Sequence, residues 1–403
     1  MTARAACTIA AREQWALARV VAASFAEHNP GIPVFVLLAD EPDGAFDPAL
    51  EPFEVVTLAD LALPHRCGLL FRYAQQPLSY ALTPHLLSLL LERGYEQVLF
   101  IKQESLVAAV LEVPFATLDT KAIALTPHLL GPLTGERAAD GELPILLAGA
   151  YNGGILGVAN RRQGRDFLAW WRDRLLDHCR HAPANGMHFE QRWLDLVPSY
   201  FDQTGIVRDP GCNVGHWNVG ERDLRLQGGR ILAGERPCSL VRFSGFDERQ
   251  PDRVSRYSDL RLADIGPAAD VWRLYLERLV AAGVHTTRGW RYAYDRFDNG
   301  VGIPVIARDL YLELGAATER FGDPFCTAGG TSFFEWLCEP VDDERGSELV
   351  VTRLWDAVYR RRRDLRRAWP DHLGADRQQF HAWTVTHGAS EFGVEEPLAG
   401  CGG

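Results

Sequence analysis

Apolar runs and amphipathic segments alternate along the first half of the chain. Four short runs are mostly apolar and predict strands, at residues 6–10, 33–39, 53–58 and 97–101; the run 33–39 is continuously apolar, as in a buried parallel strand. Between them, residues 13–27 and 79–92 repeat apolar side chains at helical spacing. This alternation predicts an α/β fold with a Rossmann-like, mostly parallel sheet flanked by helices.

The middle of the chain continues the pattern less regularly. Further strand-like runs lie at 121–125, 145–147 and 151–158. Helices are expected at 162–181 and at 187–201, the second interrupted near Pro198. Residues 209–221 are typical of a polar loop, and residues 239–246 of a strand that runs into a turn.

A polar stretch at 247–265 separates this pattern from a more helical tail. The tail repeats apolar and aromatic residues at helical spacing, at 268–282, 304–321, 331–339, 352–363 and 377–388. Core packing explains these aromatic residues best. We therefore expect two domains, an α/β domain at 1–255 and a helical C-terminal domain at 266–395.

Composition narrows the class of protein. The 403 residues are 47% hydrophobic, which suffices for packed cores and excludes a mostly disordered chain. The net charge of −11 argues against a nucleic-acid-binding protein. No apolar run reaches the ~18 residues of a membrane span, and the N-terminus lacks the pattern of a secretory signal.

The eight cysteines show neither a CxxC pair nor the spacing of a zinc site. Their simplest interpretation is reduced thiols, several of them buried as small apolar side chains. Because disulfides are rare in reducing compartments, this pattern favours a cytoplasmic protein.

Polar residues follow two of the expected strands. Asp40 comes after the run 33–39, and Lys102, Gln103 and Glu104 come after the run 97–101. Ligands of parallel α/β sheets bind beyond the carboxyl ends of the strands, so these positions are candidate site residues. For Asp40 we prefer the alternative of a turn carboxylate that caps the following segment.

Several segments carry a resemblance to a known family. They are QVLFIxxxSLV (97–107), YNGGILGV (151–158), HFEQRWLDLVPSYF (188–201), RDPGCNVGHWNVGER (208–222) and VRFSGFD (241–247). In this order they resemble bacterial glycosyltransferases of the GT-A fold, distant relatives of the retaining family that includes glycogenin and lipopolysaccharide galactosyltransferases. The tail is similar to a helical extension of some of these proteins, in RFDNGVGIP (296–304), RFGDPF (320–325) and RRRDLRRAWPD (361–371).

The resemblance implies a transferase that moves a sugar, with anomeric retention, from a nucleotide-sugar donor to an unidentified glycan, lipid or protein acceptor. Residues implied near the reaction centre are Asn152, Glu190 and Gln191. Residues implied to bind the donor are Thr8, Ala10, Lys102, Glu104, Gly153, Asp209, Asn213, Trp217, Arg242, Ser244 and Gly245. The base, the sugar and the acceptor are not specified by the sequence.

The residue types suit this work, but each also has a structural explanation. Amide side chains supply hydrogen bonds to a sugar, and glycines allow close backbone approach. Asp209 and Asn213 are equally suited to holding a loop, and Trp217 to packing in a core. Glu190 is equally suited to complementing a helix dipole. Together, in this order, these residues favour sugar binding.

The chain departs from the family at the phosphate side. The family places Asp-x-Asp after the strand, whereas Lys102 and Glu104 stand here, and Arg242 stands where relatives have a metal-binding histidine. Divalent cations such as Mg²⁺ require oxygen ligands in tight geometry, and a protonated lysine cannot ligate. We therefore predict no tight metal site and no cofactor.

Three outcomes remain open at this position. Lys102 and Arg242 could bind the donor diphosphate directly, which would give a metal-independent transferase. Catalysis could be lost, which would leave a binding or scaffold protein. Alternatively, Lys102 and Glu104 could pair with each other across the strand end with little effect. The first outcome requires that both cations converge on one place.

Overall fold

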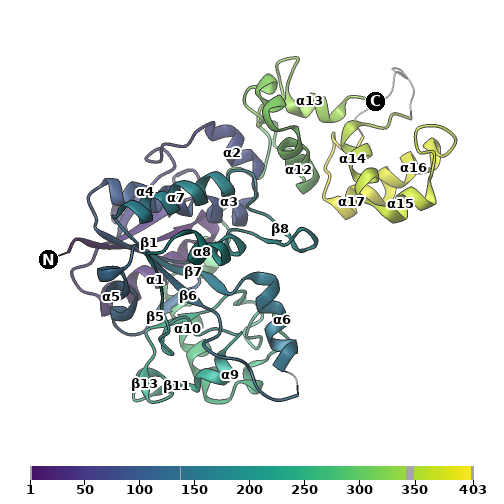
Figure 1. The fold of residues 1–403 in the computed structure, drawn as a ribbon. Coiled ribbons are helices and arrows are strands. Elements are labelled where there is room, and N and C mark those ends of the chain that lie inside the picture. Colours follow the sequence, from purple (N-terminus) through teal and green to yellow (C-terminus); the bar gives the residue numbers. More distant parts are fainter. Residues whose placement is uncertain (1, 137, 342–348, 401–403) are drawn as a thin grey trace. The chain divides into compact units, whose positions relative to one another are not determined.

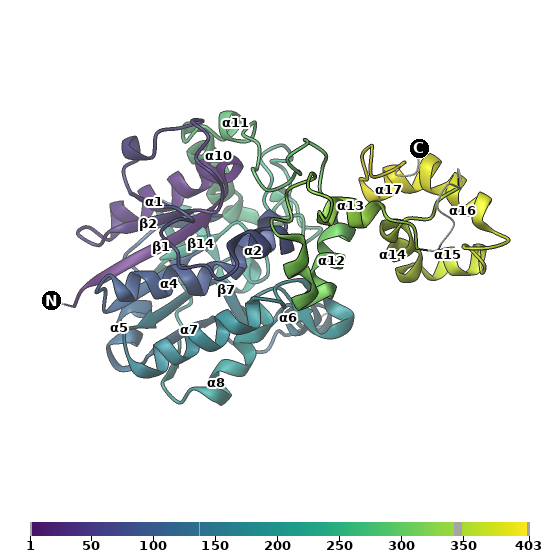
Figure 2. The same cartoon turned by 90° about the horizontal axis from the view of Figure 1, so that it is seen from above.

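The computed structural model describes residues 2–136, 138–341 and 349–400, which divide into two compact units (Figures 1 and 2). The first unit comprises Met1–Ala62 and Ser79–Tyr292. The second comprises Leu63–Leu78 and Ala293–Gly403, so it is built from two separate stretches of the chain.

A seven-stranded sheet forms the centre of the first unit. Its strands, in spatial order, are β10 (Thr204–Ile206), β6 (Ile123–Pro127), β7 (Tyr151–Ala159), β4 (Gln97–Ile101), β1 (Arg4–Ala10), β2 (Val34–Leu38) and β3 (Glu54–Val56). All neighbouring strands pair in parallel except β7, which is antiparallel to both β4 and β6. The predicted fold class, a mostly parallel α/β sheet, is confirmed.

Helices cover both faces of this sheet (Figure 1). Helices α4 (Thr83–Glu92) and α7 (Arg162–Leu175) pack against each other on one face. On the other face lie α1 (Trp15–His28) and α5 (Glu112–Thr120), where Phe25 and Phe115 pack with Leu99 of β4 in one apolar cluster. The apolar positions of each helix thus set which face of the sheet it covers.

A two-stranded antiparallel sheet adjoins the end of β4. It pairs β5 (Ser105–Val107) with β14 (Leu240–Arg242), and the register places Arg242 opposite Ser105. This pairing brings a segment late in the chain beside the residues that follow β4. A further small sheet joins β11 (Leu224–Gln227), β12 (Arg230–Ala233) and β13 (Arg236–Pro237).

The domain boundary that we placed between 255 and 266 lies at Tyr292–Ala293 in the structure. Helix α10 (Ala269–Ala281), assigned from the sequence to the helical tail, packs in the first unit. Its Tyr275 ring stacks on Phe243 at 3.7 Å between centroids, directly after β14. The aromatic spacing identified the helix correctly but did not reveal which core it joins.

The second unit is helical, as expected for the extension. Its helices are α2 (Arg66–Arg72), α12 (Val305–Leu314), α13 (Phe333–Cys338), α14 (Arg353–Arg361), α15 (Arg363–Ala368), α16 (Arg377–Trp383) and α17 (Ala389–Phe392). Its core gathers Phe71 of α2 with Tyr311 of α12 and Phe333 of α13. Buried Arg308 donates to the carbonyl oxygens of Phe71 at 2.6 Å and Tyr73 at 3.1 Å, which satisfies the end of α2.

Two expected elements differ from the structure. The run 145–147 lies in the helix α6 (Ala138–Ala148), since a run of three apolar residues does not distinguish a strand from a helix. The segment 187–201 forms β9 (Met187–His188), a 3₁₀ helix (Gln191–Leu196) and α8 (Val197–Tyr200) instead of one α-helix. The remaining short elements are α3 (Gln75–Ala81), β8 (His181–Ala182), α9 (Val219–Arg222) and α11 (Val284–Thr287).

The cysteines agree with the sequence interpretation only in part. Six described cysteines are free, at positions 7, 67, 179, 212, 238 and 326. Cys338 is disulfide-bonded, which corrects the expectation of reduced thiols throughout, and Cys401 lies outside the described residues. In the part of the chain that is described, no helix has the length and apolarity to cross a membrane.

Candidate functional site

Lys102 extends from the carboxyl end of β4 into a buried polar centre. Its Nζ lies 2.6 Å from Oε1 of Glu190 and 3.6 Å from the centroid of the Tyr80 ring. Burial disfavours the charged ammonium, but the Glu190 carboxylate and Tyr80 together outweigh this effect and raise the pKa of Lys102 above its ordinary value. Lys102 is therefore protonated at neutral pH.

The Glu190 carboxylate packs against Gly153, the third residue of β7. A Cβ on Gly153 would lie 2.5 Å from Oε1 of Glu190, so a larger residue there would displace the carboxylate. Its other oxygen, Oε2, is buried and has no hydrogen-bond partner among the described residues. A buried carboxylate oxygen without a partner is costly, and at a ligand-binding edge it indicates a functional position.

Arg242 reaches the same centre from β14. Its Nη1 donates to Oγ of Ser105 at 2.8 Å and to the carbonyl oxygen of Lys102 at 3.2 Å. Its Nη2 lies 3.4 Å from Oε1 of Glu104. The guanidinium rests on Gly154, where a Cβ would lie 2.4 Å from Cζ. Burial lowers the pKa of Arg242 from its ordinary value, and the Glu104 carboxylate opposes this shift.

These four charges form two crossed ion pairs, Lys102 with Glu190 and Arg242 with Glu104. The pairing of Lys102 with Glu104 that we considered from the sequence is therefore not the one observed. Arg242 donates to the main-chain carbonyl oxygen of Lys102, and its positive charge opposes that of the Lys102 ammonium, so the two cations lie within electrostatic reach of each other. Two cations and two carboxylates leave the centre with no formal net charge.

Amide side chains beside this centre form a connected network. Asn152 accepts from Gly154 N at 2.6 Å and donates to Oδ1 of Asn213 at 3.0 Å. Asn213, which has a left-handed φ of 67°, donates to Pro127 O at 3.1 Å. Gln191 accepts from Gly153 N at 2.9 Å and donates to Ala148 O at 3.0 Å. The network fixes the start of β7 against the 209–218 loop.

The remaining predicted residues lie at three places in the fold. Asp209 accepts from Gly211 N at 3.0 Å and so holds its loop, and half-buried Trp217 packs edge-on against His128. Thr8 and Ala10 are buried within β1, opposite residues of β2. Two further predicted residues, Ser244 and Gly245, lie on the loop that follows β14.

A cavity of about 330 Å³ lies beyond the ends of β1 and β14, in the first unit. Residues after β1, on the loop after β14 and around α11 line it: Glu13, Gln14, Leu17, Gly245, Phe246, Asp247, Glu248, Arg249, Gln250, Arg253, Arg256, Val284 and Arg288. Gln14 also accepts from Nε2 of Gln103 at 3.3 Å, which links the cavity to the segment after β4.

The arginines of this cavity differ in their partners. Arg249 pairs with Asp247 at 2.7 Å, and Arg288 pairs with Glu248. Arg253 and Arg256 form no ion pair with any described carboxylate; Arg256 instead donates to the Tyr257 hydroxyl at 2.6 Å. Two guanidinium groups that lack a carboxylate partner make this cavity suited to a phosphorylated ligand.

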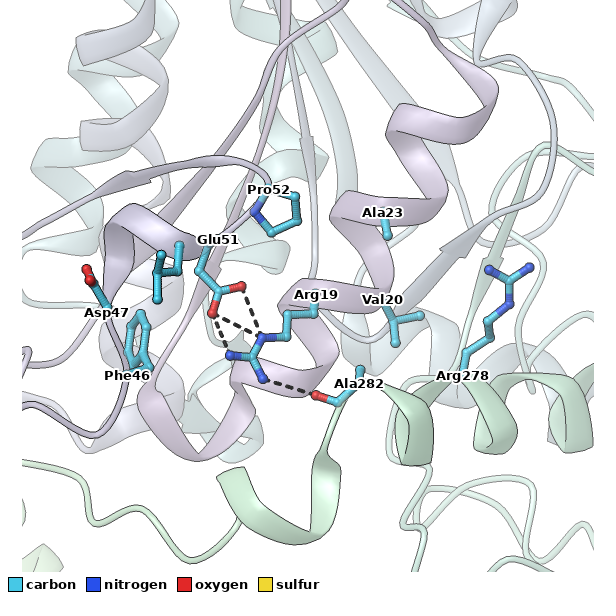
Figure 3. Close-up of a pocket in the computed structure, with 10 residues that line it drawn as sticks. Arg19, Val20, Ala23, Phe46, Asp47, Glu51, Pro52, Arg278 and Ala282 are labelled. Carbon is cyan, nitrogen blue, oxygen red and sulfur yellow. Dashed lines mark hydrogen bonds and ion pairs between the residues drawn. The ribbon is translucent and has the colours of Figure 1, made fainter.

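A larger cavity, of about 590 Å³, lies at α1, the segment before β3 and the end of α10. Its Arg19 is held by both carboxylate oxygens of Glu51 and by the carbonyl oxygen of Ala282 (Figure 3). Because Arg19 is already satisfied and the other lining residues are mainly apolar, this cavity lacks the chemistry of a phosphate site.

The side chains of the centre can be compared with the needs of a divalent cation, which takes oxygen ligands in defined geometry. Within the described ranges, no group of three or more His, Cys, Asp or Glu side chains is arranged to hold a metal ion. Lys102 cannot ligate a metal, and the Glu104 carboxylate already faces Arg242.

Sequence reasoning missed several residues of the centre. Tyr80, whose ring contacts the Lys102 ammonium, lies in α3, where nothing in the pattern distinguishes it from a core aromatic residue. Ser105 was visible only as part of the 97–107 motif. Arg253 and Arg256 were available as cations on a polar stretch after the 241–247 motif, but that stretch was interpreted as a domain boundary.

Comparison with known proteins gives partial matches. No family model matches the chain. Residues of this chain are 35% identical over 101 residues to the uncharacterized protein YfnF of Bacillus subtilis, and 25% identical over 100 residues to YfnD of the same organism. These alignments cover 25% and 24% of this chain, and the chain spans only about a third of each relative, 33% and 32%.

Solved structures that resemble this chain are glycosyltransferases. The galactosyltransferase LgtC is 13% identical, with a TM-score of 0.41 over 69% of this chain and 95% of that chain. The glycosyltransferase GlyE of Streptococcus pneumoniae is 14% identical, with a TM-score of 0.40 over 74% and 67%. Mouse xyloside xylosyltransferase 1 is 11% identical, with a TM-score of 0.36 over 59% and 97%.

Proposed function

We propose that this protein is a glycosyltransferase that uses a nucleotide-sugar donor and needs no divalent metal. One observation carries the proposal. Two buried cations, Lys102 and Arg242, lie within electrostatic reach of each other beyond the carboxyl end of β4, at positions where a metal-dependent relative would have carboxylate and histidine ligands. The adjoining cavity adds Arg253 and Arg256, which lack carboxylate partners.

In this proposal the cations stabilise the leaving group. Transfer breaks the bond between the anomeric carbon and a phosphate oxygen and forms a bond to an acceptor oxygen, which leaves a nucleoside diphosphate. Arg253 and Arg256 bind the diphosphate, and Arg242 and Lys102 supply positive charge at the sheet edge. Glu190 and Gln191 lie closest to the reaction centre, and retention of anomeric configuration follows only from the family resemblance.

The test is a donor screen by calorimetry and turnover. UDP-, dTDP- and GDP-sugars are titrated with EDTA or with Mn²⁺, and release of the nucleoside diphosphate is measured with and without acceptors. We expect one donor to bind and turn over equally well in EDTA. Strict dependence on Mn²⁺ would refute metal independence, and failure of every donor to bind would refute the proposed class.

A second candidate, a binding protein that has lost catalysis, is favoured by a specific observation. Glu190 is neutralised by Lys102, and both ends of the Gln191 amide are occupied by backbone groups. Both near-centre residues therefore serve the protein's own structure. Binding of a nucleotide sugar without release of product, across a broad acceptor panel, would favour this second function.

The location of the protein stays a prediction. The six free cysteines favour a cytoplasmic setting, whereas the disulfide at Cys338 does not.

A further inference from the structure

The contacts of Arg242 are uneven. Nη1 is surrounded by three acceptors, the Ser105 hydroxyl and the carbonyl oxygens of Lys102 and Gly154. Nη2 has one partner, Glu104, at 3.4 Å, and Nε is buried with no partner among the described residues. The Nη2 side of the guanidinium is therefore the side on which another anion could bind.

Glu104 is the most accessible of the four charged side chains in the centre. Its side chain is 23% exposed, against 9% for Lys102 and 2% for both Arg242 and Glu190. Its backbone is fixed, because its carbonyl oxygen accepts from Phe243 N at 2.8 Å. The carboxylate can therefore leave Arg242 by side-chain rotation without disturbing the pairing of β5 with β14.

The Glu104 carboxylate also interacts electrostatically with an arginine that lines the cavity. Burial disfavours the charged form of Arg256, but the Tyr257 hydroxyl, and to a smaller extent the Glu104 carboxylate, raise the pKa of Arg256 above its ordinary value. Glu104 thus acts on a buried arginine, Arg242, and on a cavity arginine, Arg256. A diphosphate held by both arginines would meet the Glu104 carboxylate at the same place.

We propose that Glu104 is an internal anion that competes with the donor diphosphate for Arg242, and so limits donor affinity. This inference rests on the proposed function. A carboxylate and a phosphate both accept hydrogen bonds from a guanidinium, and a phosphate oxygen at Nη2 would lie against the Glu104 carboxylate, which carries the same sign of charge. Removal of the Glu104 carboxylate should therefore strengthen donor binding, whereas removal of a metal ligand would weaken donor binding.

The experiment compares Glu104→Gln with the parent by calorimetry, in EDTA, with UDP, ADP, GDP, dTDP and inorganic pyrophosphate as probes. We expect Glu104→Gln to bind the preferred diphosphate about five- to tenfold more tightly, as removal of one nearby like charge predicts. Glu235→Gln, on the exposed β12–β13 turn, removes the same charge elsewhere and should leave affinity unchanged. Glu104→Ala serves as a second variant if Glu104→Gln is unstable.

The outcomes separate the two proposals. If the parent binds a nucleoside diphosphate and both Glu104 variants bind it equally or more weakly, the competition is refuted while the proposed function stands. If no probe and no nucleotide sugar binds to the parent or to either variant, the proposed function fails and the competition fails with it. Equal tightening by Glu235→Gln would show a general charge effect and would also refute the competition.

Discussion

At the scale of single residues, the buried pair of Lys102 and Glu190 is the contact whose disruption should change the free energy of unfolding most. Both side chains are almost fully buried, and their charged atoms are 2.6 Å apart. Removing one partner of such a pair leaves an uncompensated buried charge, whereas replacing both with neutral groups is often tolerated. The two side chains should therefore be strongly coupled.

We expect Lys102→Met alone to lower the free energy of unfolding by about 3–5 kcal/mol, because Glu190 would remain buried and charged. The double variant Lys102→Met with Glu190→Gln should recover most of this loss. Urea denaturation of the parent, both single variants and the double variant measures the coupling. Additive effects of the two substitutions would show that the ion pair has no coupling energy.

Burial of His128 predicts a fold that loses stability in acid. Burial lowers its pKa from 6.5 to about 3, while its Nδ1 lies 3.3 Å from the carbonyl oxygen of Ala150. Below about pH 6.5 the imidazole of His128 is protonated in the unfolded chain but stays neutral in the folded chain. The free energy of unfolding is therefore not reduced by His128 above about pH 6.5, and it decreases as pH falls toward 3. We expect thermal stability to decrease over this range, and His128→Gln to make the decrease shallower. An unchanged slope in the variant would exclude His128 as a source of the acid sensitivity.

At the scale of elements, the start of β7 sets the position of the charged centre. Gly153 gives room to Glu190 and Gly154 gives room to Arg242, so one strand end controls both ion pairs. The sequence analysis expected these glycines to allow close approach of a sugar. In the structure, the groups that approach closely are side chains of the protein itself.

We expect Gly154→Ala to lower the free energy of unfolding by about 1–3 kcal/mol and to weaken diphosphate binding, because its Cβ would overlap the Arg242 guanidinium. Gly220→Ala is the matched control, since nothing lies within 4 Å of a Cβ at that position. Denaturant titration and calorimetry measure the two effects. Equal stability of the two alanine variants would contradict the steric role of Gly154.

Element order was largely predictable from the sequence, but the pairing of charges was not. The run 97–101 matches the bounds of β4, because Gln97 is followed by four consecutive apolar residues that end at the polar Lys102. The crossed ion pairs depend on the register of Arg242 opposite Ser105 and on the space left by Gly153. Periodicity reports which face of an element is buried, but it does not report which distant side chains meet there.

At the scale of the whole molecule, the chain has two units, each with its own core. The core of the second unit is formed by buried apolar side chains, namely Phe71 and others from the range 297–399. In the same unit, Arg308 donates to the carbonyl oxygens of Phe71 and Tyr73. The centre at Lys102 lies in the first unit. A domain that has its own core can unfold as a unit.

We expect two transitions in scanning calorimetry. Arg308→Met should lower the temperature of one transition, since four backbone carbonyl groups lose their donor, and Lys102→Met should lower the other. A single transition that both substitutions shift equally would show that the two units unfold as one.

The split origin of the second unit has a practical consequence for truncation. Stopping the chain after Tyr292 would remove the residues that pack around Phe71 while keeping α2, whose Leu69, Leu70 and Phe71 are all buried in the intact protein. That fragment would expose the apolar side chains of α2 to water and would tend to aggregate. A well-behaved version of the first unit requires two cuts, with residues 63–78 replaced by a short hydrophilic bridge.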